Sequence, residues 1–202
     1  MDRDAISLRP ARPTHAEGLA YAHYAHLASE GFFRFLLGSR AEKIIADAFV
    51  QPNHDLSYQY TVFAESNGAI VGMYSGYTAQ QHRSASTEEL KRAVGFNLRA
   101  RILMLVFAPL MRLIDSIADG DYYLQFIAVD GNARGSGVGS LLMNHVEEHA
   151  RATGSGRITL DVSANNREAV EFYNHRHMQV ESKWPRRLSL PDLTFYRMTK
   201  TL

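Results

Sequence analysis

The sequence predicts an α/β domain, and two stretches of the chain carry this prediction. The apolar run Leu124–Val129 has the length and the residue types of a buried strand, and a glycine-rich loop and a helical pattern follow it. A second buried strand is predicted at 157–162, directly after that helix. Residues 58–64 and 69–77 are predicted to form two further strands, joined at the hairpin turn Ser66-Asn67-Gly68.

The first fifty residues predict one strand and two helices. Residues 5–9 form a short strand pattern before two prolines. Thr14 can cap a helix that runs to about Ser29, and Glu17 stands where a capping box needs an acid. Residues 40–50 form a second helical pattern. We therefore expect the order strand, helix, helix, strand, strand in the first half of the chain.

The segment 84–120 is longer than a connection between neighbouring strands requires. Its apolar residues recur at helical spacing around Pro109, which marks a kink or a break; they are Leu103, Val106, Phe107, Leu110, Leu113, Ile114 and Ile117. The apolar run 102–110 is too short to cross a bilayer, which takes about 20 residues. We expect a helical insertion within one domain that spans 4–202, and the alternative is a lid or a dimer surface.

The loop after Val129 has the features of an anion site. Arg134-Gly135-Ser136-Gly137-Val138-Gly139 precedes the helix, and its three glycines let a ligand approach main-chain amides closely. Those amides lie at a helix N-terminus, where N–H groups are unpaired and the helix dipole is positive. Arg134 adds a full positive charge. The loop therefore predicts a site for a phosphate or a pyrophosphate.

Two common phosphate motifs do not fit this loop. A nucleotide P-loop needs Lys and then Ser or Thr after its last glycine, but Ser140-Leu141 follows Gly139 here. The glycine spacing also differs from the G-x-G-x-x-G of dinucleotide-binding folds. Asp161 stands about where such a fold places its ribose-binding acid, yet the 40 or so residues after it are too few for the remaining strands.

The pattern Arg-Gly-x-Gly-x-Gly between a strand and a helix closely resembles the acetyl-CoA pyrophosphate loop of the GNAT superfamily of N-acetyltransferases. A second motif of that family has an Asn, an Ala three positions later and a Tyr seven positions later, and Asn166, Ala169 and Tyr173 match it. The resemblance is strong over 121–182 and holds in outline over the first 120 residues. One departure is His177-Met178, which stands where the family usually has Gly-Phe.

The resemblance implies a fold, a donor and a set of binding residues. The fold is a twisted mixed sheet of about seven strands flanked by helices, and acetyl-CoA is the cosubstrate. The backbone of a bulged strand would pair with the pantetheine arm, and the loop amides would hold the two phosphates. The residues implied in donor binding are Ile127, Ala128, Val129, Arg134, Gly135, Ser136, Gly137, Val138, Gly139, Ser140 and Asn166.

Tyr173 is the candidate general acid that protonates the leaving coenzyme A thiolate, because a phenol and a thiol have neighbouring ordinary pKa values. The alternative is a core tyrosine at a helix end. Asn166 can likewise cap its helix as well as bind the donor. The general base is not identified: the family often has a Glu on the strand before the loop, where this chain has Gln125, which cannot take a proton. Glu30, Tyr77 and His82 lie in segments that could reach the acceptor, and the sequence does not rank them.

A metal site is not expected. His145-Val146-Glu147-Glu148-His149 matches the H-x-x-E-H pattern of a class of zinc peptidases. Both histidines fall on the apolar face of the helix that the phosphate loop already explains, so packing is the favoured interpretation.

Composition adds only broad limits. The chain has 202 residues, no cysteine and a net charge of +1, so bulk charge predicts neither a nucleic-acid nor a membrane partner. No signal-peptide pattern opens the sequence, and we expect a cytoplasmic protein, with a homodimer as one possible state. The aromatic residues Phe32, Phe33, Phe35 and Phe107 could wall an apolar pocket. We expect a small, partly hydrophobic primary amine as the acceptor, whose nitrogen attacks acetyl-CoA directly in a ternary complex. The alternatives are a protein or peptide N-acetyltransferase and a non-catalytic acyl-CoA-binding module.

Overall fold

The computed structural model describes residues 6–86, 116–185 and 194–202. Most of the predicted helical insertion at 84–120 lies outside these ranges. Within them, seven strands form one sheet in the order β1-β2-β3-β4-β5-β7-β6. The strands are β1 (Ile6–Pro10), β2 (Thr61–Ser66), β3 (Ala69–Thr78), β4 (Asp121–Val129), β5 (Arg157–Ser163), β6 (Gln179–Trp184) and β7 (Phe195–Thr201). All neighbouring strands are antiparallel except β4 and β5, which are parallel. The predicted mixed sheet is confirmed.

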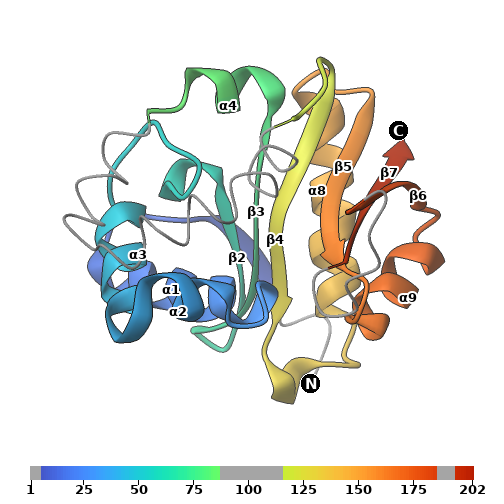
Figure 1. The fold of residues 1–202 in the computed structure, drawn as a ribbon. Helices are drawn as coiled ribbons and strands as arrows, with labels where there is room; N and C mark the ends of the chain where they lie inside the picture. Colours follow the sequence, from blue (N-terminus) through green and yellow to red (C-terminus); the bar gives the residue numbers. More distant parts are fainter. Residues whose placement is uncertain (1–5, 87–115, 186–193) are drawn as a thin grey trace.

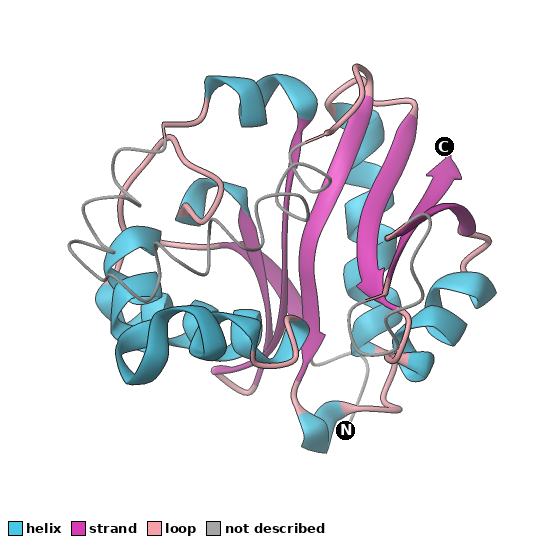
Figure 2. Ribbon diagram, viewed as in Figure 1, coloured by secondary structure: helices cyan, strands magenta, loops and turns pink. Residues whose placement is uncertain are grey.

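Helices cover both faces of this sheet (Figures 1 and 2). The described α-helices are α1 (His15–Ala28), α2 (Phe32–Leu37), α3 (Ala41–Phe49), α4 (Ala79–Ser84), α8 (Val138–Ala152) and α9 (Arg167–His175). Three short 3-10 helices are η2 (Gly38–Arg40), η3 (Tyr58–Tyr60) and η4 (Gly131–Ala133). Helices α1, α2 and α3 pack on one face, and α8 and α9 pack on the other.

Local sequence explains several of these boundaries. The Thr14 hydroxyl accepts the Glu17 N–H at 3.3 Å, which caps α1 as predicted. The Glu17 carboxylate instead accepts the N–H of Arg12 at 2.6 Å, so the predicted reciprocal bond of a capping box is replaced. Residues 58–60 form a 3-10 turn and not the start of a strand, because the Ser57 side chain caps this turn through the N–H of Gln59.

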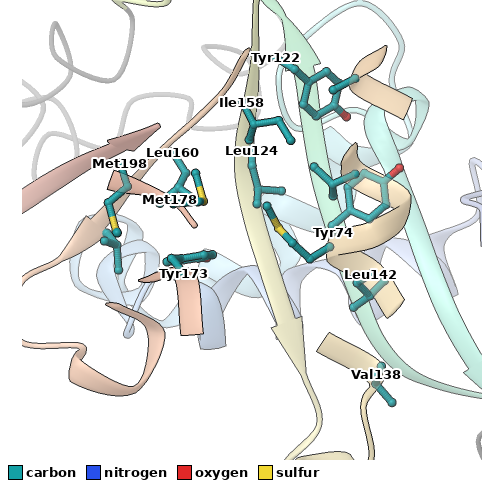
Figure 3. Close-up of a cluster of buried hydrophobic side chains, with 14 of the residues drawn as sticks. Tyr74, Tyr122, Leu124, Val138, Leu142, Ile158, Leu160, Tyr173, Met178 and Met198 are labelled. Atoms are coloured by element: carbon teal, nitrogen blue, oxygen red, sulfur yellow. The ribbon is translucent and has the colours of Figure 1, made fainter. Parts of the chain in front are cut away.

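Two hydrophobic clusters form the core, one on each face of the sheet. The cluster under α8 and α9 contains Tyr74, Tyr122, Leu124, Val138, Leu142, Ile158, Leu160, Tyr173, Met178 and Met198, all labelled in Figure 3. The cluster under α1 and α3 includes Tyr21, Ile45, Phe49, Phe63 and Met73. Each cluster joins a helix layer to the sheet, so the positions of the helix ends are tied to the strands that they cover.

The turn after α9 shows how His177-Met178 fits where the family usually has Gly-Phe. His177 has a φ of 63°, the left-handed conformation that a glycine adopts most easily, and its N–H bonds to the Asn174 carbonyl at 2.9 Å. Met178 is buried in the cluster under α9. The helix therefore ends in a left-handed turn, with Met filling the apolar position that follows.

The strands β4 and β5 pair only at their beginnings. The parallel ladder joins Asp121–Tyr123 to Arg157–Thr159, after which β4 continues along β3 to Val129 and β5 continues along β7 to Ser163. From Leu124 onward, β4 has no strand among the described residues on the edge that faces β5. Figure 1 shows the two strands diverging toward the end of the sheet where η4 lies.

Candidate functional site

A buried carboxylate closes the narrow end of the split between β4 and β5. The Asp121 carboxylate accepts two bonds from the Arg157 guanidinium, at 2.8 and 2.9 Å, and a third from the Thr159 hydroxyl at 2.7 Å. The charge of Asp121 is thus fully paired although its side chain is only 5% exposed. These bonds hold the first residues of both strands together where the ladder ends.

A second network crosses the split just beyond this point. The Tyr123 hydroxyl of β4 donates to Asp161 of β5 at 3.0 Å. The guanidinium of Arg197 in β7 donates two hydrogen bonds to the same carboxylate, at 3.0 and 2.7 Å. Tyr123 and Arg197 were not predicted as site residues, because they reach Asp161 only through the strand order β4-β5-β7. Asp161 is held by these groups, a role that sequence spacing did not indicate.

An extra residue bulges β4 beside the split. In the β3–β4 ladder, Ser75 pairs with Phe126 and Gly76 pairs with Leu124, so no residue of β3 pairs with Gln125. Gly76 is required here, because a Cβ atom at this position would lie 2.7 Å from both the Tyr122 ring and the Tyr123 carbonyl oxygen. After the bulge, Ile127, Ala128 and Val129 pair with β3, and no described strand pairs with them on the side of β5.

The glycine loop lies at the wide end of the split. Gly135 and Gly137 have φ values of 74° and 91°, a conformation that other residues rarely adopt. Gly137 is the N-cap of α8, and the first helical bond joins the Leu141 N–H to the Gly137 carbonyl at 3.0 Å. The N–H groups of Val138, Gly139 and Ser140 precede that bond and lie at the positive end of the helix dipole.

The loop is partly exposed, and Arg134 carries a positive charge beside it. Arg134 is more than half exposed and pairs with the exposed Glu168 of α9 at 3.3 Å, a contact of little energetic weight in water. A hollow of about 330 Å³ borders the loop and is lined by Ile6, Gly137, Ser140, Leu141 and Asn144. An anionic group can therefore reach the free amides of α8 and the guanidinium of Arg134.

Helix α9 carries the other two predicted residues. The Asn166 side chain accepts the Ala169 N–H at 3.0 Å, so it caps α9 and accounts for the spacing of these two residues. Tyr173 is buried among Leu160, Met178 and Met198, as Figure 3 shows, and burial raises the pKa of its phenol. A raised pKa keeps the phenol protonated, which is the form that a proton donor needs.

The three residues left unranked as possible bases separate in the structure. Glu30 is exposed at the end of α1. Tyr77 and His82 lie together on the α1 face: their rings stack with centroids 5.5 Å apart, and Tyr77 also packs against Tyr123 at 5.8 Å. Gln125 accepts a weak bond of 3.5 Å from the Ser75 hydroxyl. Because Gln125 carries an amide and not a carboxylate, it cannot act as the base at the bulge.

The H-x-x-E-H pattern of α8 is part of the packing against the sheet. His145 Nδ1 and the Tyr74 hydroxyl are hydrogen-bonded at 2.8 Å, and the rings of His145 and His149 stack with centroids 6.4 Å apart. Burial lowers the pKa of His149, and the neighbouring His145 lowers it further. Over the described ranges, no group of three or more His, Asp or Glu side chains could hold a metal ion.

None of the helices in the described ranges is both long enough and apolar enough to cross a membrane.

Comparison with known proteins identifies the same fold. The family model described as Acetyltransferase (GNAT) family matches residues 23–178. An N-acetyltransferase from Staphylococcus aureus Mu50 superposes with a TM-score of 0.67 at 16% identity, covering 96% of this chain and 100% of that one. The PaiA N-acetyltransferase of Thermoplasma acidophilum, solved with coenzyme A, gives 0.56 at 12% identity, with 98% and 99% covered. Arabidopsis thaliana Naa50, solved with the bisubstrate analogue CoA-Ac-MVNAL, gives 0.52 at 18% identity, with 98% and 99% covered. No curated protein sequence matches the chain.

Proposed function

The chain belongs to the GNAT acetyltransferase family, and we propose that it transfers the acetyl group of acetyl-CoA to the primary amine of a small molecule. The observation that carries this proposal is the split between β4 and β5, which has a bulge near its narrow end and bare helix amides at its wide end. A long donor with an anionic head and a reactive tip fits a site of this form. The S. aureus and T. acidophilum proteins are N-acetyltransferases of the same fold.

Each part of the site has a role in this proposal. Val138, Gly139 and Ser140 bind the pyrophosphate through their N–H groups, with Arg134 supplying the countercharge, and Gly135, Ser136 and Gly137 shape the turn. The free edge of Ile127, Ala128 and Val129 pairs with the amides of the pantetheine arm. Asn166 caps α9 beside this arm. An N–H after the bulge, that of Ile127, stabilises the developing oxyanion.

The reaction requires two proton movements. The acceptor ammonium loses one proton, its nitrogen attacks the acetyl carbon, and the C–N bond forms as the C–S bond breaks. The thiolate takes a proton from Tyr173, and the amide nitrogen gives up its second proton to restore the phenol. The products are the amide, coenzyme A as the free thiol, and one proton released to solvent.

The donor site is tested by placing a negative charge in the loop without straining a glycine. Ser140 is an exposed residue in the first turn of α8, where an acid favours the helix by about 0.3–1 kcal/mol. Ser140→Glu should therefore fold normally, yet repulsion of the phosphates should weaken acetyl-CoA binding roughly tenfold to a hundredfold. Calorimetry with acetyl-CoA measures this difference.

The matched control is Ala16→Glu, which adds the same charge to the exposed first turn of α1, on the other face of the sheet. Its affinity for acetyl-CoA should equal that of the wild type. If Ser140→Glu binds acetyl-CoA as tightly as Ala16→Glu, the loop does not bind the pyrophosphate.

The acceptor is tested with a panel of primary amines and peptides in a thiol-release assay. Small amines should be acetylated with the highest kcat/KM. The alternative is a peptide acceptor, which the bisubstrate analogue bound to Naa50 supports for that protein. Preference for a peptide N-terminus or a lysine side chain would replace the small-amine proposal, and tight acetyl-CoA binding without turnover on any amine would favour the non-catalytic module.

A further inference from the structure

Only one of the two carboxylate oxygens of Asp55 has a hydrogen-bond partner among the described residues. Asp55 lies between α3 and η3, and its Oδ2 atom is 2.9 Å from the Nδ1 atom of His82. The Oδ1 atom of the same carboxylate is shut off from solvent and has no hydrogen-bond partner among the described residues. A buried carboxylate oxygen without a donor costs more than most proteins tolerate, and such an atom calls for an explanation.

A second buried polar atom without a partner lies close to the first. Tyr21 is fully buried, and its hydroxyl has no hydrogen-bond partner in the described parts of the chain, although it approaches Ser75. Burial raises the pKa of the Tyr21 phenol, and the negative charge of Asp55 raises it further. The same two causes raise the pKa of Tyr60. The charge of Asp55 thus acts on both phenols. The Tyr77 ring links Tyr60 to His82, with ring centroids 5.8 and 5.5 Å apart.

These residues are connected to the bulge of β4 through Ser75. Tyr21 approaches Ser75, and the Ser75 hydroxyl bonds to the side chain of Gln125, the bulged residue, at 3.5 Å. On the other side, the His82 ring stacks on Tyr77, whose ring lies 5.8 Å from those of Tyr60 and Tyr123. The group thus runs from Asp55 to the place where the acetyl group sits in the proposed function.

The chemistry of this group matches one kind of ligand. A carboxylate accepts charge-assisted hydrogen bonds from an ammonium, and the faces of tyrosine rings attract cations. The Nδ1–H of His82 donates to Oδ2 and so fixes the carboxylate, which leaves Oδ1 able to accept from another donor. An ammonium supplies such a donor, and a neutral apolar ligand does not.

We propose that Asp55, held in place by His82 and flanked by Tyr21 and Tyr60, is the subsite that receives the ammonium group of the acceptor. The inference rests on the proposed function and narrows it to amines that are protonated in solution. His82 acts as a positioning residue for the carboxylate.

The test compares a cation with an uncharged molecule of the same shape. Phenethylammonium and phenethyl alcohol are titrated calorimetrically into the full chain saturated with coenzyme A. The wild type should bind the ammonium about tenfold or more tightly than the alcohol, since a hydrogen bond to a charged group is stronger than one between neutral groups. Asp55→Asn should lose this preference and retain the affinity for the alcohol.

The matched control is Asp47→Asn. Asp47 also pairs with a histidine, His15, at 3.8 Å and with Lys43 at 2.6 Å, but it lies exposed on α3. This variant should keep the preference for the ammonium. Equal binding of the two probes by the wild type, or an unchanged preference in Asp55→Asn, overturns the proposal.

A separate titration with acetyl-CoA distinguishes the two levels of inference. Asp55→Asn should bind acetyl-CoA as the wild type does, because the donor lies along β4 and α8. If the wild type itself fails to bind acetyl-CoA, the proposed function fails; if only the ammonium preference is missing, the subsite alone is wrong.

Discussion

In the proposed mechanism the phenol of Tyr173 delivers its proton from within an apolar cluster, and this role can be tested directly. Tyr173→Phe keeps the ring that packs against Leu160 and Met178 and removes only the hydroxyl. We expect kcat to fall roughly tenfold to a thousandfold, the usual range for loss of a general acid, with little change in acetyl-CoA affinity. Steady-state kinetics and calorimetry on the same preparations measure both quantities.

The pH dependence gives this prediction a second readout. Because burial raises the pKa of Tyr173 above its ordinary value near 10, the phenol stays protonated throughout neutral and mildly alkaline pH. The wild type should therefore show no loss of kcat from ionisation of this group between about pH 7 and pH 10. A normal kcat in Tyr173→Phe would show that Tyr173 serves only in core packing and does not donate a proton.

Single residues also show where sequence patterns are ambiguous. The motif Asn166, Ala169, Tyr173 predicted the helix correctly, and the structure shows that capping alone explains the first two positions. The dyad of Asp55 and His82 could not be predicted, since 27 residues separate them and only the approach of α4 to the segment before η3 brings them together. His82 was named among three possible bases, but Asp55 carried no local signal.

At the scale of elements, the strongest local signals gave the correct structure. The hairpin turn at Asn67-Gly68, the caps of α1 and α9, and the strand before the glycine loop all follow from chemistry within a few residues. Helix α4 was missed, because its capping box of Thr78 and Gln81 lies directly at the end of a long apolar strand. Its six residues are too few to show a helical period.

The geometry of the split is a property of strand pairing, which the residues alone do not encode locally. Only the resemblance to a family implied a bulged strand. The structure shows the physical basis: Gly76 admits the bulge opposite Gln125, and Asp121 binds Arg157 and Thr159 across the short parallel ladder. Removing either feature would alter where β4 leaves β5, and with it the position of every donor contact further along the strand.

At the scale of the whole molecule, the proposed donor and acceptor groups lie on opposite faces of one sheet. The glycine loop opens the helix that packs with one core cluster, whereas Tyr21 belongs to the cluster under α1 and α3. The two sets meet at β4, where the Ser75 hydroxyl bonds to the side chain of the bulged residue Gln125. This arrangement lets the acceptor side vary without disturbing the donor side.

The segment 87–115 lies outside the described residues, but both of its ends are anchored to the body of the protein. Arg83 and Asp119 form a salt bridge of 2.7 Å, the Ser86 N–H bonds to the Asn53 carbonyl at 2.7 Å, and Arg197 bonds to the Ser116 carbonyl at 2.7 Å. The flanking residues are thus close enough for a short connection. A linker of roughly eight Gly and Ser residues spans about 15 Å on average, which suffices for this purpose.

Replacing 87–115 with such a linker should separate donor binding from acceptor turnover. The groups proposed to bind the donor lie in β4, α8 and α9, outside the replaced residues, so acetyl-CoA affinity should stay within a few-fold of the wild type. Turnover of the best amine should be lost if the segment is a lid over the acceptor, which is the alternative to a packed helical insertion. Calorimetry and the thiol-release assay on the shortened chain give both values. Normal acetylation by that chain would assign the segment to packing or to contact between subunits, and the size of any sedimenting species in the two proteins would decide between those roles.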